Sequence, residues 1–404
     1  MIPRPTYLEK LHRWREKDVI KVVTGVRRCG KSTVLQLFAE DLLLQGVPPE
    51  RIITINLEQL ENERLLDYHT LHDEILGRVT TDEMHYVFID EIQNVNDFQK
   101  AVDSLYTRKN IDLYITGSNA FLLEGTLATL LSGRYVEIAM TPLSLSEYAA
   151  AQPNNDLSLQ RLYSRYIAQG GFPATIDFAH NSLSLHDYLE GILNTVLFKD
   201  VAQRLNIANT LGLSALVDYM FDNIGNLTSI KKITDTLVSQ GTKLSYNTVA
   251  EYLSALCNSY VLYPVKSFDL RGKRLLQQPT KYYGVDMGMR RMLLSNQVRD
   301  TGRILENVVY LDLMRHASSV YVGRVGDLEV DFVAQTASGA AYYQIAETVA
   351  DERTLERELL PLSRIADNHP KYLLTLDDVD PIDRNGILQI NALDWMMGHA
   401  PSKM

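Results

Sequence analysis

Short apolar runs alternate with helically spaced apolar positions over the first 150 residues. Residues 19–23, 86–89 and 111–116 have the length and the β-branched or aromatic content of buried strands. After the first of these runs, apolar side chains recur at the period of a helix, at Val34, Leu35, Leu37 and Phe38. This alternation predicts an α/β fold built on a parallel sheet.

The pattern changes in the rest of the chain. Residues 157–211 have helical apolar spacing, interrupted by Gly-Gly-Phe-Pro at 170–173, which forces a turn. Helical patterns at 213–224, 229–239 and 245–259 then precede a strand at 261–265, the order of a winged helix. We therefore predict a P-loop core at 1–150, a helical lid or extension at 151–211, a winged-helix domain at 212–290 and a small α/β domain at 291–404.

The segment between the first strand and its helix matches the phosphate-binding pattern G-x-x-x-x-G-K-S/T. Its residues are Gly25, Val26, Arg27, Arg28, Cys29, Gly30, Lys31, Ser32 and Thr33. The two glycines allow a tight turn around an anion, which the loop N–H groups and the next helix's N-terminus face. We expect Lys31 to reach the β- and γ-phosphates and Ser32 to ligate Mg²⁺. The sequence thus predicts a nucleoside triphosphate site.

Two carboxylates follow the second apolar strand. Asp90 and Glu91 stand where this strand would open onto the phosphates. We expect Asp90 to hold Mg²⁺ through water and Glu91 to polarise the attacking water. A general base beside the metal favours hydrolysis over phosphoryl transfer to a second substrate.

Two further candidates have both a catalytic and a structural interpretation. Ser118 or Asn119, after the third strand, either orients the lytic water or belongs to a plain turn. Arg134 follows an apolar helix-like stretch at 121–131. It is either an arginine finger for a neighbouring subunit's site or a surface residue.

These motifs together resemble the AAA+ ATPases of the AAA_14 type that carry a C-terminal domain of unknown function, DUF4143. The resemblance rests on Arg-Arg within the loop and on segments 90–93, 116–119, 132–134, 142–144, 170–173, 281–283 with Asp286, and 329–332. It implies ATP as the nucleotide, an AAA+ core, a winged helix, a nuclease-like domain and a homo-oligomer.

The last segment resembles the core of PD-(D/E)xK nucleases, with Glu306, Asp331 and Gln344 at positions of the metal site. Those enzymes also need a Lys two residues after the middle position, where this chain has Ala346. Glu347 cannot replace it, because a carboxylate does not stabilise negative charge developing on a phosphate. We predict a degenerate nuclease fold kept for binding or scaffolding, unless a Lys or Arg from another element enters the site.

The predicted winged helix offers residues to a nucleic acid. Tyr246 and Asn247 begin its third helix, and a glycine turn carries Arg271, Lys273 and Arg274. The formal net charge of −10 disfavours broad attraction to DNA. Winged helices also bind proteins, so the sequence leaves DNA and a protein client as equal alternatives.

Composition adds few constraints. A length of 404 residues predicts two or three domains. The chain has no apolar run of membrane-spanning length and no signal-peptide pattern near Met1, so we expect a cytoplasmic protein without a membrane contact. Cys29 and Cys257 are far apart in sequence, which argues against zinc and disulfides.

Two classes of function fit the sequence. The first is an Mg²⁺-dependent ATPase that acts on or with nucleic acid. The second is a nucleotide-gated switch or scaffold whose state a protein partner reads. Glu91 favours the first class because a pure switch needs no strong base, whereas the acidic charge balance favours the second.

Overall fold

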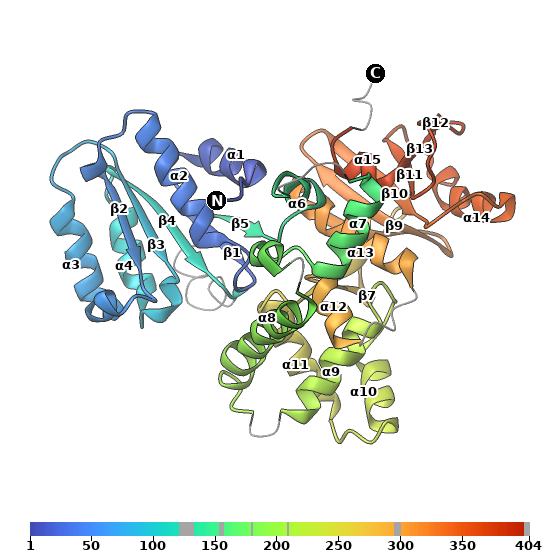
Figure 1. The fold of residues 1–404 in the computed structure, drawn as a ribbon, viewed down its shortest axis with the longest axis horizontal. Helices are drawn as coiled ribbons and strands as arrows, with labels where there is room; N and C mark the ends of the chain where they lie inside the picture. Colours follow the sequence, from blue (N-terminus) through green and yellow to red (C-terminus); the bar gives the residue numbers. More distant parts are fainter. Residues whose placement is uncertain (121–132, 153–156, 179–180, 208–209, 295–299, 400–404) are drawn as a thin grey trace. The chain divides into compact units, whose positions relative to one another are not determined.

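The computed structural model describes residues 1–120, 133–152, 157–178, 181–207, 210–294 and 300–399 (Figure 1). Within these ranges the chain forms two compact units. The first consists of Met1–Thr141 with Asn258–Tyr260, and the second of Pro142–Cys257 with Val261–Met404. The helix-like stretch predicted at 121–131 lies outside the described residues.

A parallel sheet forms the centre of the first unit. In its described part the sheet has five strands in the order β2-β3-β4-β1-β5. The strands are β1 (Ile20–Gly25), β2 (Ile52–Asn56), β3 (His85–Asp90), β4 (Ile111–Gly117) and β5 (Tyr135–Met140). The helices are α1 (Pro5–Trp14), α2 (Lys31–Leu44), α3 (Tyr68–Arg78) and α4 (Phe98–Tyr106). The predicted α/β fold with a parallel sheet is confirmed.

Alternate residues of the central strands serve the two faces of this sheet. Val87 and Ile89 of β3 belong to the same apolar core as Leu71 of α3. Phe88, between them, instead meets Phe38 of α2 edge to face, with 6.1 Å between the ring centroids. Because both faces are covered, the central strands are mostly apolar, as the sequence pattern indicated. The buried ion pair of Lys21 on β1 with Asp112 on β4 is an exception.

The second unit begins with helices. They are α6 (Leu145–Ala150), α7 (Leu159–Gln169), α8 (Ser182–Thr195), α9 (Leu211–Asp222), α10 (Ile230–Ser239), α11 (Tyr246–Asn258) and α12 (Met287–Leu293). The predicted helices at 213–224, 229–239 and 245–259 are confirmed as α9, α10 and α11. Ser245 caps α11, because its Oγ accepts the Thr248 N–H at 3.1 Å.

A mixed sheet spans the remainder of this unit. In the described residues it has eight strands, in the order β12-β13-β11-β10-β9-β8-β6-β7. They are β6 (Leu262–Asp269), β7 (Arg274–Gly284), β8 (Ser319–Val325), β9 (Leu328–Thr336), β10 (Gly339–Ile345), β11 (Lys371–Thr375), β12 (Ile382–Asp383) and β13 (Ile387–Asn391). Helices α13 (Thr301–His316), α14 (Glu352–Ser363) and α15 (Ala392–Met396) accompany it. Throughout the described ranges, every helix is too short or too polar to cross a bilayer.

One pairing in this sheet joins two segments that the sequence analysis separated. Strand β6 pairs in parallel with β8, through Ser267 with Val322 and Asp269 with Arg324. The β6–β7 hairpin, assigned to a wing, is therefore also the edge of the C-terminal sheet. The boundary predicted at 290 does not interrupt the sheet, because a pairing across some fifty residues leaves no mark in local sequence patterns.

The turn at Gly170 and Gly171 accommodates a buried carboxylate. Asp286 accepts the Gly171 N–H at 2.6 Å and the Met289 N–H at 2.8 Å, and so also caps α12. Gly170 has φ +84°, and a Cβ on it would lie 2.3 Å from Asp286 Oδ1. Burial raises the pKa of Asp286 to about 6, although its backbone hydrogen bonds act in the opposite direction.

The raised pKa of Asp286 predicts a specific pH dependence of stability. The folded chain holds this proton more tightly than the unfolded chain, in which the carboxyl has its ordinary pKa of 3.8. The stabilisation of the folded state by this bound proton is therefore complete below pH 4 and is lost as the pH rises through about 6. Relative to Asp286→Asn, the wild type should lose about 3 kcal/mol of unfolding free energy between these limits. Urea unfolding of both proteins across this range measures it, and a constant difference would contradict the assignment.

Candidate functional site

The predicted phosphate loop connects β1 to α2. Gly25 has φ +145°, Arg28 +64° and Gly30 +102°, so the backbone turns repeatedly through conformations that side chains disfavour. A Cβ on Gly25 would lie 2.2 Å from the Met140 carbonyl oxygen of β5, which requires glycine there. Such turns let successive N–H groups face one anion.

The loop is anchored from the N-terminal helix. The buried Arg4 guanidinium donates to the Cys29 carbonyl at 2.9 Å and to the Thr141 carbonyl at 2.8 Å. Tyr7 Oη accepts the Thr141 N–H at 3.1 Å. Sequence reasoning missed Arg4 and Tyr7, whose only sequence clue is a cation between two prolines near Met1.

Lys31 lies across the loop that precedes it. Its Nζ donates to the carbonyls of Gly25, at 3.0 Å, and Val26, at 3.2 Å. The same nitrogen lies 3.7 Å from Glu91 Oε1. The loop and the end of β3, predicted separately, thus meet at one ammonium group.

The other loop residues differ in exposure. Val26 and Cys29 are buried and belong to the packing beneath the loop. Arg28 and Ser32 are exposed, and Thr33 is half-buried. Arg27 pairs with Glu58 at 3.6 Å. Ser32 therefore has the accessibility that a metal-binding hydroxyl needs.

Thr116 connects the two carboxylates that follow β3. Strand β4 lies between β1 and β3, so the end of β4 adjoins both the loop and Asp90. Thr116 Oγ1 donates to Asp90 Oδ1 at 2.5 Å and accepts the Glu91 N–H at 2.8 Å. Asn56 of β2 donates to the other Asp90 oxygen at 3.2 Å. Neither Thr116 nor Asn56 was assigned a role from the sequence.

Glu91 is held on both sides. Its φ of +56° lies in the left-handed region, which costs about 1–3 kcal/mol for a residue with a side chain. Its Oε2 accepts hydrogen bonds from Ser118, at 3.2 Å, and from Gln93. Asn119, which follows Ser118 just after the end of β4, is also buried. The structure thus places Ser118 of the predicted pair on the Glu91 carboxylate.

These side chains suit a magnesium ion. The Ser32 hydroxyl and the Asp90 carboxylate are hard oxygen donors, which Mg²⁺ prefers. Since two neighbours orient the buried Asp90 carboxylate, it is already held in place. The chemistry of this donor set fits the metal that the sequence predicted.

Arg134 lies away from its own chain's loop. It precedes β5, whose first residue pairs with Ile20, whereas the loop follows Gly25 at the other end of β1. Arg134 Nη1 contacts Asp103 Oδ1 at 2.5 Å, and 46% of the arginine side chain is exposed. It therefore cannot reach phosphates bound at the loop of the same chain.

The three residues predicted for a nuclease-like site form one connected group in the structure. Glu306 Oε1 lies 2.7 Å and Asp331 Oδ1 3.7 Å from Lys281 Nζ on β7. Gln344 Oε1 accepts the Asp331 N–H at 3.4 Å, and its Nε2 donates to Glu358 Oε2 at 2.9 Å. The sequence did not assign Lys281 to this cluster, since the strand that carries it lies far away in sequence.

The residues predicted to meet DNA are accessible. Tyr246, Asn247, Arg271, Lys273 and Arg274 are all exposed. Arg274 has an acidic neighbour, since its Nε lies 3.8 Å from a carboxylate oxygen of β6. The surface is thus available to a partner, without a feature that identifies the partner.

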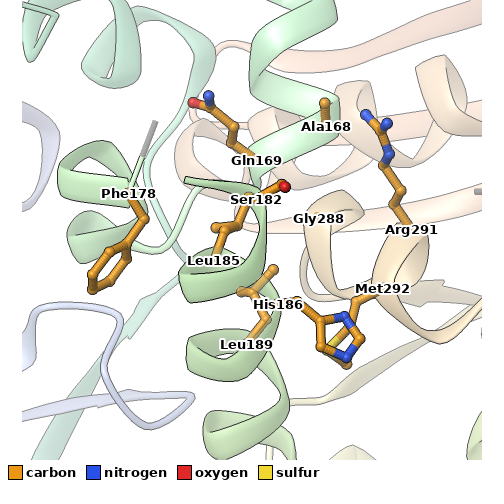
Figure 2. A pocket seen from close by; sticks show the side chains of 10 residues that line it. All are labelled: Ala168, Gln169, Phe178, Ser182, Leu185, His186, Leu189, Gly288, Arg291 and Met292. Carbon is orange, nitrogen blue, oxygen red and sulfur yellow. The ribbon is translucent and has the colours of Figure 1, made fainter. Parts of the chain in front are cut away.

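A cavity of about 420 Å³ lies in the second unit, among α7, α8 and α12 (Figure 2). Polar and apolar side chains share its wall, and Figure 2 shows the polar side chains Gln169, Ser182, His186 and Arg291 at separate points of it. No residue of the phosphate loop and neither Asp90 nor Glu91 lines it. The cavity adds no chemistry to the site described above.

Two family models match the chain. Residues 17–149 match the AAA domain AAA_14, and residues 160–300 match a domain of unknown function, DUF8612. The first match covers the loop, β3 and β4. The second differs in name from the predicted DUF4143, which stays a prediction together with the winged-helix and nuclease-like assignments.

Proteins of known sequence and structure resemble the chain over most of its length. An uncharacterized protein of Haemophilus influenzae is 37% identical over 400 residues, covering 98% of this chain and 99% of that protein. The uncharacterized protein MJ1544 of Methanocaldococcus jannaschii is 29% identical, covering 78% of this chain and 71% of that protein.

Among solved structures, a Walker-type ATPase of Pyrococcus abyssi aligns with a TM-score of 0.52 at 16% identity. The alignment covers 73% of this chain and 96% of that protein. At this identity it shows a shared fold alone. The chain thus has a P-loop AAA domain and belongs to the family of the Haemophilus influenzae protein.

Proposed function

We propose that this chain is an Mg²⁺-dependent ATPase that uses the loop at 25–33 and the carboxylates of Asp90 and Glu91. The observation that carries the proposal is the 3.7 Å separation of Lys31 Nζ and Glu91 Oε1. It joins a phosphate-binding loop to a carboxylate whose position Thr116 and Ser118 fix. The AAA domain match and the ATPase named among the similar structures support the same function.

The chain's own groups divide the binding work. The loop N–H groups and Lys31 bind the phosphates, and Lys31 exchanges its hydrogen bonds to loop carbonyls for phosphate oxygens. Ser32, and Asp90 through water, would hold Mg²⁺, which would neutralise charge on the phosphate oxygens. Thr116 keeps Asp90 oriented before the nucleotide arrives.

Glu91 is the general base in this proposal. Its carboxylate accepts a proton from water as the water oxygen bonds to the γ-phosphorus. The bond to the β–γ bridging oxygen breaks at the same time, and ADP keeps the electron pair. Ser118 and Gln93 restrain the carboxylate, and Asn119 orients the water. This arrangement favours hydrolysis because it places a general base beside the phosphates.

Arg134 acts in this account on the site of a second copy. It is half exposed, and the length of β5 separates it from its own chain's loop. A guanidinium supplied from a neighbour stabilises charge developing on the transferred phosphoryl group. The proposal therefore includes a homo-oligomer in which each site is completed by the next subunit.

Nucleic acid is the substrate class that we propose for the second unit. The exposed Arg271, Lys273 and Arg274 occupy the turn between β6 and β7, and Tyr246 and Asn247 start the helix expected to meet a groove. A DUF4143-type winged helix followed by a nuclease-like region would place these residues on the DNA. The alternative is a nucleotide-gated switch that binds a protein and ignores nucleic acid.

Substitutions at Lys31 and Glu91 should separate binding from hydrolysis. Lys31→Ala should abolish binding of a fluorescent ATP analogue, because the ammonium that neutralises the phosphates is lost. Glu91→Gln should keep binding but lower ATP turnover by about 10²–10⁴-fold, since the base is removed without a change in shape. Exposed Glu50→Gln is the matched control. Equal turnover by Glu91→Gln and the wild type would show that Glu91 is not the general base.

Mixing two inactive variants tests the role of Arg134. Arg134→Ala should bind ATP yet hydrolyse it poorly, whereas Lys31→Ala lacks bound nucleotide but retains the arginine. A mixture should regain up to about a quarter of wild-type activity in a dimer, because one site of each mixed pair is complete. Exposed Arg108→Ala should behave like the wild type. The assignment fails if Arg134→Ala alone is fully active.

The effect of DNA on ATP turnover distinguishes the two functions. Duplex DNA should stimulate turnover of the wild type, and the triple substitution of Arg271, Lys273 and Arg274 by Ala should remove the stimulation and reduce the salt dependence of DNA binding. Triple substitution of the exposed Arg353, Arg357 and Arg364 is the charge-matched control. If DNA does not change the ATP turnover of the wild type, the result would favour the nucleotide-gated switch that binds a protein partner.

A further inference from the structure

A buried ammonium lies among carboxylates in the second unit. Among the described residues, Lys281 Nζ lies 2.7 Å from Glu306 Oε1, 2.8 Å from Glu329 Oε1 and 3.7 Å from Asp331 Oδ1. Only 5% of the lysine side chain is exposed. These acidic residues come from α13 and β9, while the lysine comes from β7.

Other groups hold each carboxylate toward the lysine. Tyr283 Oη donates to Glu306 Oε1 at 2.5 Å, and the Ile345 N–H donates to Asp331 Oδ2 at 2.8 Å. Arg324 Nη2 lies 3.2 Å from the second oxygen of Glu329. The cluster is thus pre-organised, because each carboxylate has its own donor in addition to Lys281.

The electrostatic environment keeps Lys281 charged. Burial alone would lower the pKa of its ammonium, but the carboxylates of Glu306, Asp331 and Glu329 outweigh burial and raise it above the ordinary value. Burial, followed by the charge of Glu306, raises the pKa of the Asp331 carboxyl. The lysine is therefore the positive centre on which the acids depend.

The charges of the cluster are nearly balanced. Counting the described side chains named above, three acids face Lys281 and Arg324, which leaves one excess negative charge when all are ionised. Without Lys281 the excess would be two, which is the charge of one divalent cation. Lys281 thus supplies half of the positive charge that a divalent cation would bring to this position.

The residues present do not fit a resident divalent metal. The nuclease-like resemblance implies such an ion between Glu306 and Asp331, with a lysine beside it that contacts the scissile phosphate. Here the ammonium itself lies between these two acids, and its contacts with Glu306 and Asp331 use oxygens that a metal would need. A metal and Lys281 cannot share this position.

We infer that the ammonium of Lys281 is the built-in cation of this site and takes the place of the divalent metal. The lysine from another element does not restore the missing catalytic cation, because it lies at the metal position and not beside it. Its role is to fasten β7 to α13 and β9. The inference concerns the second unit alone and does not depend on the proposed ATPase activity.

Metal binding by variants of the full-length, nucleotide-free protein tests this inference. Mn²⁺ binding is followed by the EPR signal of the free ion, and Tm is measured with and without Mn²⁺. The variants are Lys281→Ala, Asp331→Asn and the double variant. Lys266→Ala, an exposed lysine on the adjacent strand β6, is the matched control.

The inference predicts distinct outcomes for these proteins. Lys281→Ala should lower Tm by about 5–15 °C, as expected for an uncompensated buried charge cluster, whereas Lys266→Ala should leave Tm nearly unchanged. Mn²⁺ should restore part of the loss in Lys281→Ala and bind to it at one additional equivalent. The double variant should lose that equivalent, and the wild type should have no Mn²⁺ site that Asp331→Asn removes.

Two results would overturn the inference. One is a wild-type Mn²⁺ site that Asp331→Asn abolishes, especially if it accompanies Mn²⁺-dependent cleavage of plasmid DNA. The other is a folded Lys281→Ala that gains no Mn²⁺ site, because the acids would then form only an ion-pair cluster. If Lys281→Ala does not fold, the comparison of the wild type with Asp331→Asn decides the question by itself.

Discussion

The candidate site depends on the hydroxyl of Thr116. This buried group donates to the Asp90 carboxylate and accepts the backbone N–H of Glu91, so one side chain sets the positions of both acids. It can do so because β4 is inserted between β1 and β3. The same insertion places Ser118 against the Glu91 carboxylate and leaves Lys31 between the loop and that acid. The order of the strands in the sheet, more than the spacing of the motifs along the sequence, therefore determines which side chains meet in the site.

Buried charges play a comparable organising role in the second unit. Asp286 joins the turn at Gly171 to the start of α12, and its burial makes the carboxylate costly at neutral pH. The Lys281 ammonium instead stabilises a group of carboxylates, since it compensates negative charges that would otherwise repel one another. Both groups connect elements that are distant in sequence. Asp286 and Lys281 belong to motifs that this chain shares with the family it resembles. In this unit both residues stabilise the fold by connecting distant elements.

The sequence predicted those parts of the site that are encoded locally. The loop at 25–33, the apolar strand before Asp90 and the helices from residue 211 onward have patterns within one short window, and the structure confirms these elements. Arg4, Thr116 and Lys281 were missed in their observed roles because each acts through a contact across at least 25 residues. The edge pairing of β6 with β8 was missed for the same reason. Local patterns predict elements, whereas pairings between distant elements need the folded chain.

A crystal structure with Mg²⁺ and a non-hydrolysable ATP analogue would show directly whether the loop at 25–33 binds the nucleotide. We expect the phosphates in this loop, with Lys31 Nζ moved from the carbonyls of Gly25 and Val26 to phosphate oxygens. We also expect the metal on Ser32, with Asp90 behind a bound water and Glu91 facing the γ-phosphate. An analogue bound elsewhere at saturating concentration, with the loop empty and both Lys31 carbonyl contacts kept, would show that the loop is not the nucleotide site.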